Sequence, residues 1–265
     1  MEFIALAQSL ARSAGALILS RMGEQVTAEE KSSAFDVVTQ VDKDCEQLIR
    51  EGILSQHLDH EILGEEDTFL AQKSLEEVLS AVKKDTYLWI VDPIDGTSNF
   101  VQGIAGFTVS IALAYNGELL LGVVYDPSCD EMFSAVKGEG AFLNGKPIHV
   151  SNKTGLHTSV IATGFPSQMD ARLAVYNGLG KLIHECRTIR SLGSAARHLA
   201  YVGAGRLDGF WENGLKTWDV AAGVLIVQEA GGQVSDTNGN SYSLNTLHIV
   251  STNGLVHESL LDCLK

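Results

Sequence analysis

The sequence predicts a mixed α/β protein whose first half is built around an antiparallel sheet and whose second half alternates strands with helices. Three observations support this fold class. Apolar residues recur at helical spacing over residues 2–21, Asn-Gly turns separate apolar runs in the middle of the chain, and strand-like and helix-like segments alternate after residue 150. This mixture is typical of α/β and α+β domains.

The first half divides into two amphipathic helices and a series of strands. The helices are expected over residues 2–21 and 42–56. A short strand in "HEILGEE" runs into an acidic turn, and "TYLWIVD" has the composition of a buried strand. Hairpins are expected in "FTVSIALAYNGELLLGVVYD" and "EMFSAVKGEGAFLNGKPI", with turns at Asn116-Gly117, Lys137-Gly138 and Asn144-Gly145.

The second half alternates more regularly. We expect helices over residues 170–185, from Ser194 onward and over 218–230, and strands over 158–163, 187–190, 207–212 and near 233 and 247. The 265 residues are enough for one large domain or for two packed lobes, 1–150 and 151–265. No repeat, low-complexity tract or flexible linker separates the halves, so we expect a single domain over residues 1–265, tightly packed across any boundary near 150.

Charge and cysteine usage narrow the class of protein. The formal net charge of −14 argues against nonspecific nucleic-acid binding and against adhesion to anionic membranes. No window approaches the roughly 20 uninterrupted apolar residues of a membrane span, and the apolar start of the chain lacks the basic region of a signal peptide. The four cysteines have no metal-binding or disulfide spacing. Reduced thiols of this kind are typical of a cytoplasmic protein.

A paired-carboxylate motif, "WIVDPIDGTSNF", contains the predicted buried strand and the turn after it. Pro93 cannot continue a sheet ladder, so the strand is expected to end at Asp92. A tight turn would then bring Asp92 and Asp95 to one side, with the backbone carbonyl of Ile94 between them. These hard oxygen atoms suit Mg²⁺ or Mn²⁺. Without a cation or a proton the two carboxylates would repel each other.

Gly96, Thr97 and Ser98 follow directly in the sequence. Gly96 permits a tight turn, and the turn could open a helix whose free N–H groups and positive dipole end bind a phosphate. The alternative interpretation is an ordinary Asp-Pro turn in which Thr97 or Ser98 is a helix N-cap.

Two further acidic positions favour the metal site. Glu65 and Glu66 in "LGEED" follow a strand-like run, and Asp219 lies in the first turn of a strongly apolar helix. Each position also has a plainer interpretation, because an acidic pair after a strand is often a solvated turn and an Asp in a first turn often only stabilises the helix dipole.

The motifs together resemble a known family. The segments "GEE", "WIVDPIDGTSNF" and "WDVAAGVLIVQEAGG" occur in this order, with "KSSAFDVVTQVD" early in the chain and "IRSLGSAARHLAYVGAGRLDGFWENG" before the last motif. In these segments and their separation the chain is similar to the inositol monophosphatase family, a branch of the Mg²⁺-dependent, lithium-sensitive phosphatases. The similarity covers nearly the whole sequence.

The resemblance implies roles for individual residues. It implies that two or three Mg²⁺ ions are bound by four carboxylates and one backbone carbonyl: Glu65, Asp92, Asp95, Asp219 and the carbonyl of Ile94. It further implies that Thr97 and Asp42 polarise the attacking water together with Glu65. Lys31 matches a lysine near the metal loop.

The resemblance also implies a set of substrate contacts. Backbone donors at Gly96 and Thr97, with Ser98 beside them, would bind the phosphate, and Arg190 matches a basic position near the same site. The positions that hold the hydroxyl groups of the polyol in the family correspond here to Gly193, Ser194, Ala195 and Glu212.

The family expectation extends to fold and cofactors. The resemblance implies a layered α/β/α/β/α sandwich of the inositol monophosphatase and fructose-1,6-bisphosphatase type, with the site between two lobes, and a homodimer. It implies Mg²⁺-dependent hydrolysis of myo-inositol monophosphate by attack of an activated water. Mn²⁺ is expected to substitute for Mg²⁺ and Li⁺ to inhibit, and neither a nucleic acid nor a membrane is an expected partner.

Other substrates and classes stay as alternatives. The motif reads Ser-Asn-Phe after Asp-Gly-Thr, as in inositol phosphatases, whereas relatives that cleave nucleotide 3′-phosphates tend to carry Lys-Glu-Phe. Glu212 favours a neutral, hydroxyl-rich leaving group, because a carboxylate accepts hydrogen bonds from hydroxyl groups and repels a second phosphate. Fructose 1,6-bisphosphate and nucleotide 3′-phosphates are the alternative substrates, and a catalytically silent regulatory binding protein is the alternative class.

The spacing of the two aspartates argues against a different phosphatase family. Haloacid dehalogenase-type phosphatases carry Asp-x-Asp-Gly-Thr after a strand, but here Asp92 and Asp95 are separated by one residue more. This extra residue moves the second carboxylate relative to the strand end, so the nucleophile and acid geometry of that family would fail.

Overall fold

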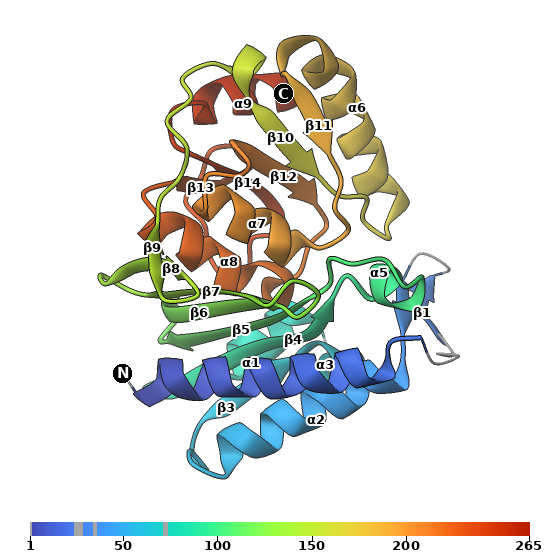
Figure 1. Ribbon diagram of the computed structural model, residues 1–265, viewed down its shortest axis with the longest axis vertical. Coiled ribbons are helices and arrows are strands. Elements are labelled where there is room, and N and C mark those ends of the chain that lie inside the picture. The colour runs from blue at the N-terminus through green and yellow to red at the C-terminus, as the bar shows by residue number, and fades with distance from the viewer. Residues whose placement is uncertain (1, 24–28, 34–35, 71–73) are drawn as a thin grey trace.

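The computed structural model describes residues 2–23, 29–33, 36–70 and 74–265. Helices and sheets alternate in layers (Figure 1). Helices α1 and α2 cover one face of the larger sheet, α7 and α8 lie between the two sheets, and α6 and α9 cover the outer face of the smaller sheet. This is the layered α/β/α/β/α arrangement that the sequence resemblance implied, so the expected fold class is confirmed.

The larger sheet has the order β3-β4-β5-β6-β7-β8-β9 among the described residues. Strand β3 is parallel to β4, and every later neighbour is antiparallel. The predicted hairpin turns are present, and Asn116 and Gly117 have φ values of 50° and 82°, the left-handed pair that a two-residue hairpin turn requires. The strands are β3 (Glu61–Gly64), β4 (Tyr87–Asp95), β5 (Thr108–Tyr115), β6 (Glu118–Asp126), β7 (Glu131–Val136), β8 (Gly140–Leu143) and β9 (Lys146–Ile148).

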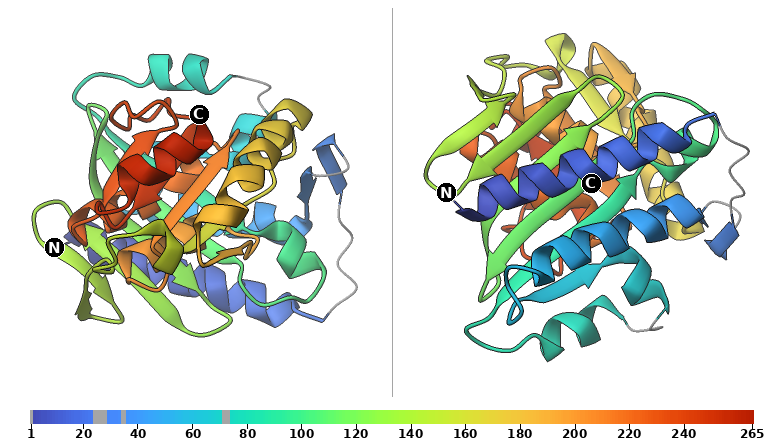
Figure 2. Two further views of the ribbon diagram at one scale, coloured as in Figure 1. Left: turned by 90° about the horizontal axis from the view of Figure 1, so that it is seen from above. Right: turned by 60° about the horizontal axis from the view of Figure 1, so that its bottom comes forward.

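The smaller sheet has the order β11-β10-β12-β14-β13 within the described part of the chain. Its first three strands are parallel, and β14 runs antiparallel to both of its neighbours. The left view of Figure 2 looks down on this sheet from above. The strands are β10 (Val160–Thr163), β11 (Thr188–Arg190), β12 (Gly209–Asn213), β13 (Gln233–Asp236) and β14 (His248–Thr252), and a separate pair consists of β1 (Glu29–Ser33) and β2 (Asp36–Val38).

The helices include five that the sequence patterns predicted and several short ones that they did not. The predicted helices are α1 (Glu2–Arg21), α2 (Gln40–Leu54), α6 (Met169–Glu185), α7 (Ala195–Gly203) and α8 (Thr217–Glu229). The short helix α5 (Thr97–Val101) begins directly after Gly96, at the turn that the sequence analysis expected could start a helix. The elements that the sequence analysis missed are α3 (Glu65–Leu70), α4 (Leu75–Ala81), the 3₁₀ turn Leu156–Thr158, α9 (His257–Leu264), β1 and β2.

One strand boundary was predicted wrongly. We expected the buried strand to end at Asp92, but β4 continues to Asp95. The ladder with β5 pairs Asp92 with Ser110 and Asp95 with Thr108, and its register shifts between these pairs. Because the bulge takes Pro93 out of the ladder, the strand tolerates a residue that has no N–H to donate.

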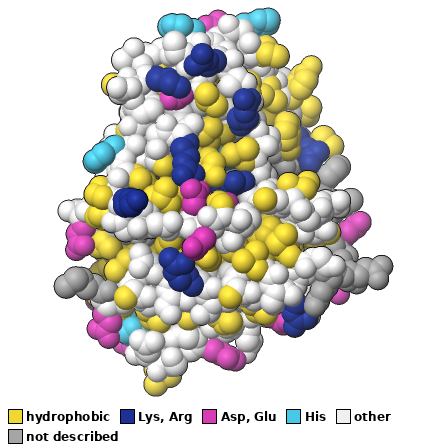
Figure 3. Space-filling view, viewed as in Figure 1, with side chains coloured by type: hydrophobic (Ala, Val, Ile, Leu, Met, Phe, Trp, Pro, Cys, Tyr) yellow, Lys and Arg dark blue, Asp and Glu magenta, His cyan; other side chains and the backbone are white. Residues whose placement is uncertain are grey.

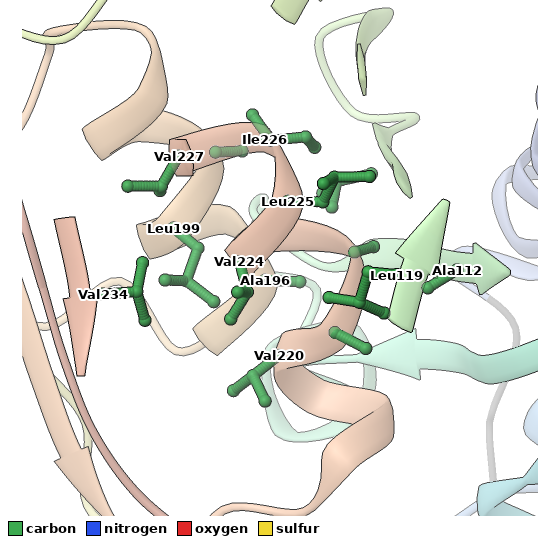
Figure 4. Packing of buried hydrophobic residues seen from close by; sticks show 14 of the residues in the cluster. Ala112, Leu119, Ala196, Leu199, Val220, Val224, Leu225, Ile226, Val227 and Val234 are labelled. Atoms are coloured by element: carbon green, nitrogen blue, oxygen red, sulfur yellow. The ribbon is translucent and has the colours of Figure 1, made fainter. Parts of the chain in front are cut away.

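Helix α8 forms the centre of the core between the two sheets. Its side chains are buried on every side, because it packs against β4, β5 and β6 on one face and against α7 and β13 on the other. Figure 4 shows Leu199 of α7 and Val224 of α8 pointing toward each other in this layer. The approach is close, since a Cβ added at Gly122 of β6 would lie 2.4 Å from the carbonyl oxygen of Ala222.

Helix α1 is, by length and composition, apolar enough to cross a membrane. In the protein it packs lengthwise on the larger sheet and on α2 (Figure 1). Leu6, Ala7, Ala14 and Ile18 are among its buried residues, so its apolar face is part of the core.

A core substitution tests this packing. We expect Leu199→Ala to lower the free energy of unfolding by about 3 kcal/mol, because Leu199 is fully buried between α7 and α8 and its removal leaves a cavity. Urea denaturation followed by circular dichroism measures the change. The matched control is Leu58→Ala, whose side chain is 87% exposed and which we expect to change stability by less than about 0.5 kcal/mol. Equal losses in the two variants would contradict the packing.

Candidate active site

A cavity of about 870 Å³ lies where the layers meet at the end of β4. Its wall is formed by the end of β4, the starts of α3, α5, α7 and α8, the end of β12 and the loop before α6. Helix starts carry free N–H groups and strand ends carry exposed side chains, so this position concentrates polar groups at one point of an otherwise apolar interior.

The two aspartates of the paired-carboxylate motif line this cavity at the end of β4. The bulge between them lets Asp92, Ile94 and Asp95 all reach the wall, although alternate residues of a regular strand would point to opposite faces. The backbone N–H of Ile94 donates to Asp92 Oδ1 over 3.0 Å, which fixes the first carboxylate against the turn.

Asp95 is held by the first turn of α7. Ser194 Oγ and the backbone N–H of Ala196 donate to Asp95 Oδ2 over 2.7 and 2.6 Å. The positive end of the α7 dipole favours a carboxylate at this point. Burial nevertheless raises the pKa of Asp95 to about 6, and the charge of Glu65 adds to the rise.

Two further carboxylates share the cavity. Asp219, in the first turn of α8, accepts a hydrogen bond of 2.7 Å from the backbone N–H of Lys216. Burial raises the pKa of Asp219 well above its ordinary value, and the charges of Glu65 and Asp95 raise it further. Glu212 of β12 is only 7% exposed, and burial, Asp95 and Asp219 raise its pKa well above the ordinary value too. The cavity therefore gathers carboxylates whose ionised forms burial and mutual repulsion disfavour.

A hydroxyl group links the cavity to a buried carboxylate behind it. Thr97 Oγ1 lies 3.1 Å from Asp42 Oδ1 and 3.0 Å from the carbonyl oxygen of Ile94. Asp42 is in the first turn of α2, where its Oδ2 accepts hydrogen bonds from the backbone N–H and the hydroxyl of Thr39 over 2.8 and 2.6 Å. This capping box fixes Asp42 and through it the hydroxyl of Thr97.

The loop before α7 is held from both sides. Asn99 Nδ2 donates to the carbonyl oxygens of Leu192 and Gly106 over 2.8 and 3.0 Å. His198 Nε2 accepts from the backbone N–H of Leu192 over 2.9 Å, so the proton of the neutral ring is on Nδ1. Burial lowers the pKa of His198 to about 3, and the charge of Arg197 adds to the effect. The neutral ring is thus the form that holds the loop at neutral pH.

The structure gathers most of the residues that the sequence singled out, but Asp42, Glu66 and Arg190 are outside the cavity wall. Asp42 lies behind Thr97, and Arg190 is exposed, with its guanidinium donating to Thr188 Oγ1 and to the carbonyl oxygen of Ile189. The side chain of Lys31 is outside the described part of the protein. The residues that line the cavity are Glu65, Asp92, Ile94, Asp95, Gly96, Thr97, Ser98, Gly193, Ser194, Ala195, Glu212 and Asp219.

Sequence reasoning missed three positioning residues. Glu46 of α2 accepts from the backbone N–H groups of Glu66 and Asp67 over 2.8 and 3.0 Å and so holds the start of α3, where Glu65 lies. Asn99 and His198 hold the Leu192 loop. Asn99 is inside the quoted motif, so its position was a usable signal. Nothing in the sequence indicates that Glu46 reaches the backbone of α3 or that His198 accepts from the loop before its own helix.

The donor set fits a hard divalent cation such as Mg²⁺ in its chemistry. Every candidate ligand is an oxygen atom, and a divalent cation would stabilise the ionised carboxylates against burial and against one another. Within the described residues, however, no three side chains of Asp, Glu, His or Cys are arranged as ligands of one ion. Asp95 turns its Oδ2 toward α7 instead. An ion would therefore be shared among fewer side chains, the Ile94 carbonyl and water, as is usual for Mg²⁺.

Comparison with known proteins identifies the family. The family model described as "Inositol monophosphatase family" matches residues 1–264. The chain belongs to the inositol monophosphatase family. The members of this family are phosphatases, which agrees with a cavity built from carboxylates and helix starts.

Individual members of the inositol monophosphatase family match over almost their full length. A Pseudomonas aeruginosa protein named Nus factor SuhB is 41% identical over 260 residues, covering 97% of this chain and 93% of that protein. A Thermotoga maritima protein named fructose-1,6-bisphosphatase/inositol-1-monophosphatase is 36% identical over 261 residues, covering 98% of this chain and 95% of that protein. The solved structure of an IMPase from Thermotoga maritima has a TM-score of 0.88 at 36% identity, covering 100% of this chain and 97% of that one.

The buried His198 predicts a pH dependence of stability. Its folded pKa of about 3 is below the ordinary value of 6.5, so the unfolded chain binds the extra proton between these values. The stabilisation is complete above about pH 6.5 and is lost as the pH falls toward 3. We expect the wild type to lose about 1.4 kcal/mol per pH unit below 6.5 relative to His198→Gln, measured by urea denaturation from pH 7 to 4. Parallel curves would contradict a neutral buried ring.

Proposed function

We propose that this protein is a Mg²⁺-dependent phosphatase that hydrolyses myo-inositol monophosphate to inositol and phosphate. The observation that carries the proposal is that carboxylates of four separate elements, β4, α3, β12 and α8, line the wall of one cavity beside the starts of α5 and α7. The carboxylates can bind the cation, and the N–H groups of the helix starts can bind the phosphate. Glu212 can accept hydrogen bonds from the hydroxyl groups of the leaving group.

The cation would be held by oxygen atoms of the turn after β4 and of two helix starts. When bound, Mg²⁺ supplies positive charge that makes a water more acidic and neutralises the phosphate. Because the cavity brings together carboxylates whose pKa values burial raises, a loaded site also keeps them ionised at neutral pH. Two or three Mg²⁺ ions would share the available groups, each ion using only some of them together with water. These groups are the side chains of Glu65, Asp92, Asp95 and Asp219 and the carbonyl of Ile94.

Thr97 would orient the attacking water. Its hydroxyl has one proton, which it donates to Asp42 Oδ1 or to the carbonyl of Ile94. When the proton points to Asp42 Oδ1, the oxygen of Thr97 accepts a hydrogen bond from a water in the cavity. As this water attacks phosphorus and the bond to the ester oxygen breaks, the water would pass a proton to Thr97, Thr97 would pass its own to Asp42, and the leaving oxygen would take a proton from solvent. Glu65, at the start of α3 on the same cavity wall, is the second acceptor for this water.

The phosphate and the polyol would occupy opposite parts of the cavity. Backbone N–H groups at Gly96 and Thr97 would bind a phosphate at the start of α5, with Ser98 beside them. Gly96 can supply this turn because its φ of 97° suits glycine. Ser194, Ala195 and Glu212 lie on the wall where hydroxyl groups would bind. The cluster of carboxylates there disfavours a second phosphate, so a monophosphate is the preferred substrate.

The names of two relatives support alternatives. The Thermotoga maritima relative is named for fructose 1,6-bisphosphate as well as for inositol 1-phosphate, which makes a sugar bisphosphate the alternative substrate. The Pseudomonas aeruginosa relative is named a Nus factor, which favours a regulatory binding role as the second candidate function. The proposed active site does not exclude a binding role on another surface.

Phosphate release from a panel of esters tests the proposal. Myo-inositol 1-phosphate, fructose 1,6-bisphosphate and a nucleotide 3′-phosphate are supplied separately in Mg²⁺, and inorganic phosphate is measured. We expect the highest kcat/KM with myo-inositol 1-phosphate. A higher value with either other ester would overturn the specificity, and no hydrolysis of any ester would leave the binding role as the better candidate.

Removal of one candidate metal ligand should abolish turnover without unfolding the protein. We expect Asp92→Asn to lower kcat by about a thousandfold or more, because it removes one charge from the oxygen set that holds the cation. The matched control is Asp262→Asn, at an exposed position of the C-terminal helix α9, for which we expect wild-type turnover. Circular dichroism confirms folding of both. Unchanged kcat in Asp92→Asn would remove Asp92 from the metal site.

Chelation and lithium test the cation itself. We expect EDTA to reduce phosphate release to background and excess Mg²⁺ to restore it, because the carboxylates alone cannot neutralise the phosphate. Mn²⁺ should restore part of the activity. Millimolar-range Li⁺ should inhibit in the presence of Mg²⁺, since it would take a cation position with half the charge. Activity that survives exhaustive chelation would contradict the proposal.

A further inference from the structure

Hydrogen bonds, rather than a cationic side chain of the described residues, hold the carboxylate of Asp95. On the face of the molecule in Figure 3, several acidic side chains lie beside Lys or Arg side chains. Glu131, for example, forms a salt bridge with Arg206. Asp95 lines the cavity and forms no salt bridge with any described residue, and the donors that contact it are O–H and N–H groups.

One oxygen of Asp95 has no lone pair left. Ser194 Oγ donates to Oδ2 over 2.7 Å, and the backbone N–H of Ala196 donates to the same oxygen over 2.6 Å. A carboxylate oxygen has two lone-pair sites, so these two donors saturate Oδ2. Oδ1 is therefore the oxygen through which Asp95 would bind a cation.

The hydroxyl group of Ser194 is saturated as well. Its single proton points to Asp95, and its oxygen accepts from the backbone N–H of Arg197 over 3.1 Å. Thr108 Oγ1 lies 3.0 Å from the same oxygen. Because Ser194 has no second proton, Thr108 is the donor of this hydrogen bond. The Ser194 side chain has no group left for a substrate hydroxyl, which would instead bind the backbone of residues 193–195.

The larger sheet fixes Thr108 in this position. Thr108 is the first residue of β5 and the ladder partner of Asp95 on β4, so their side chains lie on the same face of the sheet. The side chain of Thr108 is 0% exposed and that of Ser194 is 2% exposed. Because solvent does not reach these hydroxyl groups, their protons keep one arrangement, from Thr108 to Ser194 to Asp95. A donor to Ser194 also polarises its O–H group and strengthens the hydrogen bond to Asp95.

We propose that Thr108 is a positioning residue, which acts through Ser194 to keep Asp95 a one-oxygen ligand and thereby favours Mg²⁺ over Ca²⁺. The inference rests on the proposed function, because it concerns the cation of the same cavity. Mg²⁺ demands near-ideal octahedral geometry, whereas Ca²⁺ tolerates irregular geometry and readily binds both oxygens of one carboxylate. With Oδ2 held against α7, Asp95 cannot offer its second oxygen, and the larger ion loses a ligand.

Removal of one hydroxyl group tests the inference. Thr108→Val removes the hydroxyl and keeps the shape of the side chain. We expect it to lower the ratio of the Ca²⁺ dissociation constant to the Mg²⁺ dissociation constant by about fivefold, the equivalent of one hydrogen bond. Isothermal titration calorimetry of the substrate-free protein with each cation measures this ratio independently of turnover. Thr108→Ser, which keeps the hydroxyl, should retain the wild-type ratio.

The matched control is Thr252→Val in β14. Thr252 is also 0% exposed, and its hydroxyl lies 3.0 Å from His257 Nδ1, so the substitution removes a comparable buried hydrogen bond outside the cavity wall. We expect the wild-type ratio in this variant. A wild-type ratio in Thr108→Val, or an equal fall in Thr252→Val, would overturn the inference and leave the proposed function intact. A wild type that binds neither cation would overturn both.

A double-mutant cycle tests whether Thr108 acts through Ser194. Ser194→Gly should lower the ratio by about tenfold, because it removes a donor to the carboxylate itself. Glycine is also accepted as the N-cap of α7, so the helix start is kept, and circular dichroism confirms folding. Thr108→Val/Ser194→Gly should give the ratio of Ser194→Gly alone. Effects that multiply in the double variant would overturn the route through Ser194.

Discussion

Several carboxylates share one buried cavity. The free-energy cost of burying these carboxylates next to one another is the constraint on which the arrangement of the site depends. Burial and mutual repulsion raise the pKa values of Asp95, Glu212 and Asp219. Backbone N–H groups of the surrounding elements stabilise the ionised carboxylates. The first turn of α7 donates to Asp95, and Lys216 donates to Asp219. The first turn of a helix has backbone N–H groups with no partner inside the helix, which explains why several helices begin at the cavity.

The layered fold places those helix starts together. Helices α7 and α8 lie between the two sheets and both begin at the cavity, while the end of β4 approaches from the larger sheet. Because α8 is buried on all sides, its position is fixed by packing against both sheets, and its first turn is fixed with it. The same packing leaves α6 outermost, with one face buried and one exposed.

The sequence predicted which helices and strands are present more accurately than it predicted the residues at which they end. Periodicity and hairpin turns predicted the long helices and most strands to within a few residues, because these signals are local. The sequence analysis placed the end of β4 at Asp92. In the structure, pairing with β5 resumes at Asp95 beyond the bulge. Short α3, α4 and α9 were missed, since a helix of one or two turns has too few residues for a period to show.

What the sequence by itself determined is the set of candidate residues and the family, because carboxylates, proline and glycine in fixed local order constrain the chemistry of a turn. What only the tertiary structure decided is which of them meet. It gathered Glu65, Asp92, Asp95 and Asp219 on one wall and left Arg190 outside it. It also brought Glu46 and Asn99 to backbone groups far away in the chain, and turned His198 back onto the loop that precedes its own helix. Such contacts depend on how layers pack, and no local pattern records them.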